Sequence, residues 1–345
     1  MQAAVLEDIG KITLKEIDTP LCGEGEVLVK VEACGVCRTD MKCFTRGQRD
    51  LKMPRVLGHE ITCTAVKTGK EVKEIKEGDR LQVSPGITCG ECEYCLQGLD
   101  NLCNQLQIMG FNYDGGFAQY LLVPAQGVKR GILNKIPSHI TFEQAAMTEP
   151  LACSLNMQES LEVQKGDTVL IFGGGRLGIL NARLARSRGA GPIILVEPLE
   201  KRIAGAKNLG FDYCINPLKT DALKEVMNIS RNKGVDVVIP CCPDPRAFNS
   251  GLHMAAKRGR FGFFSGLTWE EPCLSFDLNL IHYKEIKMVG GYGCSINHNK
   301  RTLEILSSGK VEIKDIPIRA INLEEIEKGL KMVEDMSELA VTILF

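Results

Sequence analysis

The chain has 345 residues, enough for two domains and a sizeable hydrophobic core. Its 42 basic and 43 acidic residues balance, so its charge gives no reason to expect a nucleic acid or an anionic membrane as partner. No apolar run reaches the length of a membrane span, and the first eight residues lack the basic and apolar regions of a signal peptide. A cytoplasmic location is therefore the default expectation.

The N-terminal part of the chain has the pattern of short β-strands. Apolar stretches at 3–6 and 12–17 lie on either side of Gly10 and predict a hairpin. Alternating valines over 27–31 predict a half-buried strand. Glycine and proline interrupt this region often, as short strands require.

Two motifs follow that strand. Cys34-Gly-Val-Cys37 has the spacing of either a redox pair or half a zinc site. Gly58-His59-Glu60 contains the only histidine before residue 139. His59 is a candidate metal ligand, and a structural histidine is the alternative.

Four cysteines gather in the next segment, at Cys89, Cys92, Cys95 and Cys103. Four thiolates this close suit one tetrahedral zinc ion, and a site closed by four cysteines leaves no position for substrate, so its role would be structural. An iron–sulfur cluster is the alternative. The ferredoxin pattern, however, separates its last two cysteines by three residues and ends in proline, whereas seven residues separate Cys95 from Cys103 here and Asn104 follows.

The other cysteines have no spacing that suggests chemistry. In a long chain without a signal peptide, we expect them to be small buried hydrophobic residues. They are Cys22, Cys43, Cys63, Cys214, Cys241, Cys242, Cys273 and Cys294.

A helix is predicted to start after Thr141, which is a suitable N-cap, and to break or kink near Glu149 because Pro150 follows. A strand is expected before it, at 117–123. A carboxylate at a helix break among apolar residues is costly unless something pairs with it, which makes Glu149 a candidate metal ligand. Helix capping or exposure to solvent is the alternative.

The segment 168–178 joins an apolar strand to a helix through glycines. Gly173, Gly175 and Gly178 fit G-x-G-x-x-G, in which the glycines allow a tight turn, close approach of a pyrophosphate and close helix–strand packing. The free amides at the start of the helix, including those of Arg176 and Leu177, would face the anion. We predict a dinucleotide site.

The next strand, 192–196, ends at Glu197, where the first βαβ unit should close. An acidic residue there suits a ribose 2′-hydroxyl and repels a 2′-phosphate, so NAD is predicted in preference to NADP. Lys201 and Arg202 keep NADP as the alternative, and Arg202 is included among the candidate cofactor-binding residues.

Strands and helices alternate from about 166 to 287, which predicts a doubly wound parallel sheet of the α/β class. The expected strands are 168–172, 192–196, 236–240 and 259–264, with helices that include 177–188 and 246–255. After a short helix at 323–333 comes a terminal strand. The β-rich N-terminal part needs partners for its sheet, so we expect the C-terminus to return to it.

Cys37, His59 and Glu149 together form a second metal candidate. One thiolate, one imidazole and one carboxylate leave the fourth position of a zinc ion open, which is the mark of a catalytic site. Cys153 stands four residues after Glu149 and would share its helix face if the helix continues, so it is the competing ligand.

The order G-V-C-R-T-D, G-H-E, C-x-x-C-x-x-C-x7-C, E-P-L and G-x-G-x-x-G resembles the zinc-dependent medium-chain dehydrogenases over essentially the whole chain. Glutamate-proline-leucine is similar to the sorbitol, polyol and threonine dehydrogenase branches. The resemblance implies a β-rich GroES-like catalytic domain (1–150 and 288–345) with a structural zinc lobe (86–106), into which a Rossmann NAD-binding domain (151–287) is inserted.

The resemblance also implies roles. Cys37, His59 and Glu149 match the catalytic zinc ligands, and the four clustered cysteines match the structural zinc lobe. Thr39 matches the hydroxyl that relays the substrate proton, and Glu60 a carboxylate that can approach the metal. Asp40 matches a supporting carboxylate, and Cys34 matches no ligand. Lys42 replaces a histidine that often carries the proton onward, which leaves the proton exit open.

The implied reaction is the reversible oxidation of a secondary alcohol of a polyol, sugar or cyclitol, with two zinc ions per chain and NAD. Threonine and a phosphorylated polyol are alternative substrates. Arg38 or Lys42 could bind the phosphate, although Arg38 could instead lie near the cofactor pyrophosphate. A zinc-free reductase and a non-catalytic module are the rival classes, and the complete ligand set argues against both. The family suggests a homodimer or homotetramer.

Overall fold

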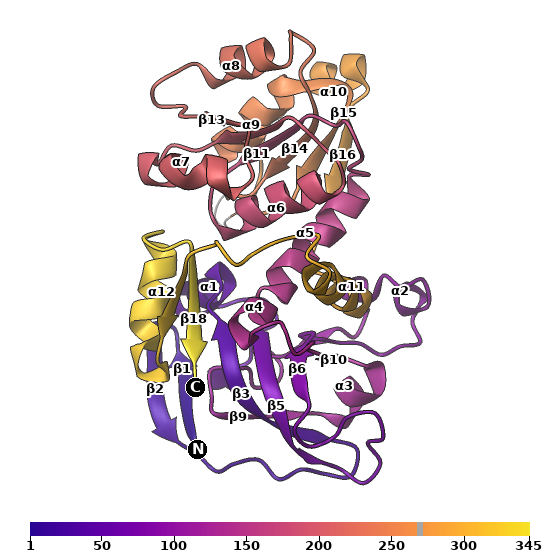
Figure 1. The fold of residues 1–345 in the computed structure, drawn as a ribbon, viewed down its shortest axis with the longest axis vertical. Helices are drawn as coiled ribbons and strands as arrows, with labels where there is room; N and C mark the ends of the chain where they lie inside the picture. The colour runs from indigo at the N-terminus through magenta and orange to yellow at the C-terminus, as the bar shows by residue number, and fades with distance from the viewer. Residues whose placement is uncertain (268–271) are drawn as a thin grey trace. The chain divides into compact units, whose positions relative to one another are not determined.

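The computed structural model describes residues 1–267 and 272–345 (Figure 1). The chain forms two compact units. The first consists of Met1–Ala152 and Cys294–Phe345, and the second is Cys153–Gly293. Both ends of the chain therefore belong to the first unit. None of the described helices is long and apolar enough to cross a membrane.

The first unit is built mainly of strands. Its strands are β1 (Gln2–Asp8), β2 (Lys11–Glu16), β3 (Val27–Gly35), β4 (Arg55–Val56), β5 (Glu60–Thr68), β6 (Arg80–Val83), β7 (Gly86–Ile87), β8 (Gln107–Ile108), β9 (Tyr120–Val123), β10 (Leu133–Lys135), β17 (Ile318–Ile321) and β18 (Ala340–Leu344). Its helices are α1 (Arg38–Arg46), α2 (Glu93–Leu96), η1 (Asp100–Leu102), α3 (Ala125–Arg130), α4 (Phe142–Ala146), α11 (Ile296–Ser307), η3 (Leu323–Glu325) and α12 (Ile326–Glu334), together with the start of α5 (Thr148–Ser160).

The two ends of the chain meet in one sheet of the first unit, with strand order β10-β6-β5-β3-β18-β17 and β9 also paired with β3. The C-terminal strand β18 runs antiparallel to β3, with Ile343 opposite Cys34. β1 and β2 form the predicted hairpin. The valines of β3 are fully buried together with Ile61, Leu81 and Phe117. Burial of this continuous apolar face drives the closure of the unit by its C-terminus.

The second unit contains a parallel sheet with strand order β13-β12-β11-β14-β15-β16. Its strands are β11 (Val169–Phe172), β12 (Ile193–Val196), β13 (Tyr213–Ile215), β14 (Val235–Pro240), β15 (Ala255–Phe263) and β16 (Lys287–Gly290). Its helices are α6 (Arg176–Ser187), α7 (Glu200–Ala206), η2 (Lys207–Leu209), α8 (Ala222–Ile229), α9 (Pro245–Met254) and α10 (Leu278–Lys284).

The order of this sheet reverses at β11. The chain moves from β11 outward through β12 to β13, then returns to the other side of β11 at β14. Right-handed crossovers therefore place helices on both faces of the sheet, as Figure 1 shows for α6 and α9. The crevice beside the carboxyl end of β11 is where a doubly wound sheet binds its ligand. The predicted fold class is confirmed.

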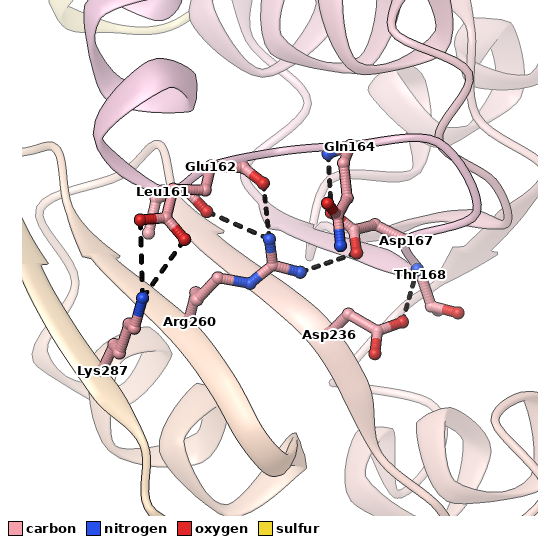
Figure 2. A network of polar contacts seen from close by, with 8 residues as sticks. All are labelled: Leu161, Glu162, Gln164, Asp167, Thr168, Asp236, Arg260 and Lys287. Carbon is pink, nitrogen blue, oxygen red and sulfur yellow. Dashed lines mark hydrogen bonds and ion pairs between the residues drawn. The ribbon is translucent and has the colours of Figure 1, made fainter.

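A polar network lies at the end of this sheet where β11 and β14 begin (Figure 2). Arg260 of β15 donates to the carbonyl oxygens of Leu161 and Glu162 at 3.2 and 2.6 Å, and to Asp167 Oδ1 at 2.6 Å. Asp167 Oδ2 accepts from Gln164 N at 2.8 Å. The Arg260–Asp167 pair, in which Asp167 is buried and Arg260 largely so, joins the segment after α5 to β15.

Two boundaries differ from the expectations. The helix after Thr141 ends at Ala146, before Glu149, and α5 starts at Thr148 with Pro150 in its first turn, where a proline removes no intrahelical hydrogen bond. The second unit extends past residue 287, because β16 pairs with β15 and completes the parallel sheet.

Candidate active site

The first candidate site is built around the carboxylate of Asp40, which is fully buried. Its Oδ2 accepts from the backbone N–H of Cys37, the N-cap of α1, at 2.8 Å, and its Oδ1 accepts from Gly58 N at 3.3 Å. Oδ1 also lies 3.2 Å from His59 Nδ1. Asp40 thereby fixes the start of α1 against the Gly58–His59 loop, which brings the Cys37 sulfur and the His59 ring together.

Ligand atoms of Cys37, His59 and Glu60 lie within 4.8 Å of one another. Glu60 is almost fully buried, and its carboxylate occupies the space beside Gly35, where a Cβ would lie 2.0 Å from Glu60 Oε2. The sequence here needs glycine because the Glu60 carboxylate needs that space. The Cys37 thiol also donates to Thr39 Oγ1 at 3.6 Å, so the predicted relay hydroxyl lies next to a predicted ligand.

The surroundings of His59 favour a positive charge. Burial lowers the pKa of the imidazole, but the Asp40 carboxylate and the Cys37 thiol raise it, and the net result is a raised pKa. A divalent cation held by Nε2 would supply that charge, with Nδ1 turned toward Asp40, the usual arrangement behind a zinc-bound histidine.

Lys42, the residue that replaces the family's histidine, also lies on α1, and burial lowers the pKa of its ammonium group.

Glu149 occupies the first turn of α5 and is 8% exposed. Among the described residues, its carboxylate groups with cysteine sulfurs rather than with the Cys37 group. Cys294 Sγ lies 3.9 Å from Glu149 Oε1. Cys153 is one helical turn further along α5, on the same side of the helix, as the alternative prediction required. Glu149 as the third ligand therefore stays a prediction.

The four cysteines of the lobe converge as predicted. Sulfur–sulfur distances are 3.5 Å for Cys92–Cys95, 3.8 Å for Cys89–Cys95 and 3.5 Å for Cys103–Cys89. Four thiolates around one zinc ion at about 2.3 Å would lie about 3.8 Å apart, so the arrangement fits that ion. Backbone N–H groups lower the pKa of the Cys92 thiol to about 6, first that of Cys95 and then that of Asn104. Burial instead raises the pKa of Cys95 to about 12 and raises that of Cys103, so the surroundings favour the thiolate at Cys92 but not at every sulfur.

The glycine motif forms the predicted tight turn between β11 and α6. Gly173 has φ +95°, a backbone conformation that favours glycine, and Gly175 is the N-cap of α6. A Cβ at Gly178 would lie 1.9 Å from Gly173 O, so only glycine lets α6 start this close to the strand. The amides of Arg176 and Leu177 occupy the first turn of α6, whose positive end is suited to a pyrophosphate.

Glu197 follows β12 directly and is 2% exposed. Its Oε2 accepts from Gly174 N at 2.7 Å, and its Oε1 accepts from Leu199 N at 2.9 Å. Arg202 Nη1 lies 3.7 Å from Glu197 Oε2. The carboxylate expected to bind the ribose is therefore also part of the framework that shapes the glycine loop.

Sequence reasoning missed several neighbours of these sites. The ring of Phe111 lies 5.5 Å from that of His59 and covers it on one side. Cys294, expected to be an inert buried thiol, contacts Glu149, and no spacing in the sequence indicates this. Of the cysteines expected to be buried, Cys43 and Cys63 are buried and Cys273 is exposed; the others are half-buried, namely Cys22, Cys214, Cys241, Cys242 and Cys294. Cys34 is fully buried and donates to Gly35 O, in keeping with a packed thiol.

Two family models match the chain. One is described as an alcohol dehydrogenase GroES-like domain and matches residues 23–133, and the other as a zinc-binding dehydrogenase and matches residues 177–308. The chain is also 36% identical over 307 residues to L-threonine 3-dehydrogenase from Pyrococcus furiosus, a match that covers 88% of this chain and 86% of that protein. The chain belongs to the zinc-dependent medium-chain alcohol dehydrogenase superfamily.

Other members of the superfamily are similar along nearly the whole chain. Sorbitol dehydrogenase from Bacillus subtilis is 30% identical over 335 residues, covering 96% of this chain and 93% of that protein. A zinc-binding dehydrogenase from Sinorhizobium meliloti 1021, solved with bound NADP, superimposes with a TM-score of 0.92 at 30% identity and covers 100% and 99% of the two chains. This dehydrogenase is an oxidoreductase that acts on CH–OH donors, as predicted.

Proposed function

We propose that this dehydrogenase oxidises a secondary alcohol of a polyol, sugar or cyclitol to the ketone and passes the hydride to NAD. The observation that carries the proposal is the group of Cys37, His59 and Glu60, with Asp40 behind it and a dinucleotide turn on the second unit. The similarity to sorbitol dehydrogenase supports the substrate class.

The residues present fit a zinc ion. Cys37 and His59 offer a thiolate and an imidazole whose ligand atoms already lie within 4.8 Å of each other, and Glu149 would be the third ligand. Zinc bound there would supply Lewis acidity at the alcohol oxygen, and the dinucleotide would accept the hydride from the adjoining carbon. A second zinc ion would be held by the four lobe cysteines in a structural role.

Side chains of this protein would orient the metal ligand and transfer the substrate proton. The Asp40 carboxylate lies 3.2 Å from His59 Nδ1, where it can orient the ring once an ion binds Nε2. Thr39 lies beside Cys37, where its hydroxyl can accept a hydrogen bond from the substrate hydroxyl and pass the proton on. The Phe111 ring, tilted against that of His59 at 5.5 Å, would limit the access of water to that side of the imidazole.

The preference for NAD rests on Glu197. Its carboxylate stands at the carboxyl end of β12, where a negative charge disfavours the 2′-phosphate of NADP. Arg202 lies within 3.7 Å of this carboxylate, which partly neutralises it. NADP is therefore the alternative cofactor.

L-threonine is the second candidate substrate. The 36% identity to the Pyrococcus furiosus threonine dehydrogenase favours it, since this exceeds the 30% identity to sorbitol dehydrogenase. Both substrates carry a secondary alcohol, so the roles of Cys37, His59 and Thr39 would be the same.

The test combines zinc content with turnover. His59→Ala should remove one of two zinc ions per chain and lower kcat/KM at least about 1,000-fold, which is about 4 kcal/mol of transition-state stabilisation. NAD binding should survive, because the glycine turn belongs to the second unit. His139→Ala is the matched control, since this histidine is exposed and its ring contacts Ser307 at the end of α11, away from the Cys37 group. Unchanged turnover in His59→Ala would refute the metal site.

The substrate is decided by a panel of polyols, cyclitols, their phosphates, threonine and simple alcohols, each with NAD and NADP. NADH formed from a polyol or cyclitol supports the proposal. Turnover of threonine alone would keep the metal site and replace the substrate class.

A further inference from the structure

A continuous line of polar side chains, buried at Gln82 and Asn299 and half-buried at Asn134 and Cys294, ends at Glu149. Asn134 Nδ2 donates to Gln82 Oε1 at 2.9 Å, and Gln82 Nε2 donates to Asn299 Oδ1 at 3.1 Å. Asn299 Nδ2 donates to Cys294 Sγ at 3.2 Å, and the Cys294 thiol donates to Glu149 Oε1 at 3.9 Å. All five residues belong to the first unit.

The direction of these hydrogen bonds is fixed by backbone carbonyls. The Gln82 amide nitrogen also donates to Val83 O at 2.8 Å, and that of Asn299 to Ser295 O at 3.1 Å. Turning either amide around would place its oxygen against a carbonyl oxygen. Both N–H groups of each amide are therefore used, and every donor in the line points toward Glu149.

The position of Cys294 is fixed as well. It directly precedes Ser295, the N-cap of α11, which makes a capping box with His298. Asp100 Oδ1, from the zinc lobe, accepts from Ile296 N at 3.1 Å and anchors the same helix start. Gln82 and Asn299 are each 1% exposed, so solvent competes little with these bonds.

Buried amides such as Gln82 and Asn299 are costly unless their polar atoms are satisfied, and apolar side chains could fill the same space at lower cost. The final thiol of the line holds one carboxylate oxygen of a residue that is itself 8% exposed. A metal ligand benefits from a fixed orientation. A carboxylate that rotates freely in the metal-free protein loses conformational freedom when the ion binds, and this loss weakens binding.

We propose that Cys294 and Asn299 are positioning residues for Glu149. They hold its carboxylate in the orientation that binds the catalytic zinc ion. This inference rests on the proposed function, in which Glu149 is the third ligand.

The experiment follows zinc release from the full, zinc-loaded chain to a colorimetric chelator, together with the visible absorption spectrum after cobalt substitution. Cys294→Ala should speed the release of one zinc ion per chain about tenfold and shift the cobalt d–d bands, as loss of a hydrogen bond behind a metal ligand does. The second zinc ion should leave at the wild-type rate. Cys294→Ser keeps a donor and should lie closer to wild type than Cys294→Ala.

Cys63→Ala is the matched control, because it removes another thiol of the first unit, one whose sulfur donates to Leu81 O in β6 and, among the described residues, lies outside the ligand group of Glu149. Asn299→Ser, which withdraws the donor from Cys294, carries the test if Cys294→Ala does not fold. Wild-type release and an unchanged cobalt spectrum in both variants would overturn the inference.

Glu149→Gln separates the two proposals. If this variant loses one zinc ion while Cys294→Ala and Asn299→Ser behave like wild type, Glu149 is a ligand and only the positioning role fails. If Glu149→Gln also keeps both zinc ions at wild-type release rates, the ligand assignment and the inference fail together.

Discussion

Glu197 bonds the backbone of the glycine turn and is also the carboxylate that we propose to bind the cofactor ribose. Its place at the end of β12 is the expected position of a ribose-binding carboxylate, yet its two oxygens already accept from Gly174 N and Leu199 N. Hydrogen bonds to a charged group contribute about 1.5–3 kcal/mol each. Part of that free energy keeps the glycine turn in the shape that a pyrophosphate needs.

Glu197→Ala should therefore weaken NAD binding about tenfold or more, a loss of about 1.4 kcal/mol. NADP binding should weaken less, because the same change removes a negative charge that repels the 2′-phosphate. Calorimetric titration with both cofactors measures the two effects. Glu200→Ala, an exposed carboxylate three residues away, should change neither, and unaltered NAD affinity in Glu197→Ala would contradict the dual role.

At the scale of elements, the zinc lobe and α11 are joined through Asp100. This carboxylate is 7% exposed and accepts from Ile296 N. Burial raises its pKa, although the bond from Ile296 and the charge of Arg130 oppose the shift. The folded-state pKa of Asp100 is thus above the unfolded value of about 3.9. Its contribution to stability is greatest below that pH and falls as pH rises toward the folded-state pKa.

Asp100→Asn keeps an oxygen that can accept from Ile296 N and removes the charge. The variant should gain stability relative to wild type as pH rises from about 4.5 to 8, because only the wild type then carries the cost of a buried charge. Urea unfolding midpoints across this range measure the difference. Asp79→Asn should show no such trend over this range, since the Lys135 ammonium lowers the pKa of Asp79, and its contribution changes only below about pH 4. A difference independent of pH would contradict the assignment for Asp100.

At the scale of the whole molecule, a different contact in each unit joins segments that are far apart in the chain. The first unit uses the C-terminal strand β18, which pairs with β3. The second unit uses the Arg260–Asp167 pair, which ties the entry into the sheet to β15 (Figure 2). The pair is only 11% and 6% exposed, so removing one partner leaves a buried charge uncompensated.

Arg260→Met should lower the free energy of unfolding by about 3–5 kcal/mol. The double change Arg260→Met with Asp167→Asn should recover part of this loss, because no isolated charge then stays buried. Lys287→Met, which breaks the exposed pair with Glu162, should cost about 0–1 kcal/mol. Denaturant titration compares the variants. Equal effects of Arg260→Met and Lys287→Met would show that burial does not strengthen the first pair.

The sequence by itself determined the features whose residues are close together in the chain. The lobe cysteines, the glycine turn after β11, the hairpin of β1 and β2, and the parallel strands all follow from local spacing, because turns, helices and βαβ units are set by residues within a few tens of positions. The return of the C-terminus also followed, since an N-terminal sheet with an apolar face needs a partner strand.

Only the tertiary structure decided the contacts between distant segments. Cys294 lies beside Glu149 across 145 positions, and Arg260 pairs with Asp167 across 93. Gly35 leaves space for Glu60 because β3 and β5 run side by side. Helix and strand periodicities predict the face of its own element on which a side chain lies. The residue that it contacts there depends on how the elements pack, which the spacing of residues in the chain does not indicate.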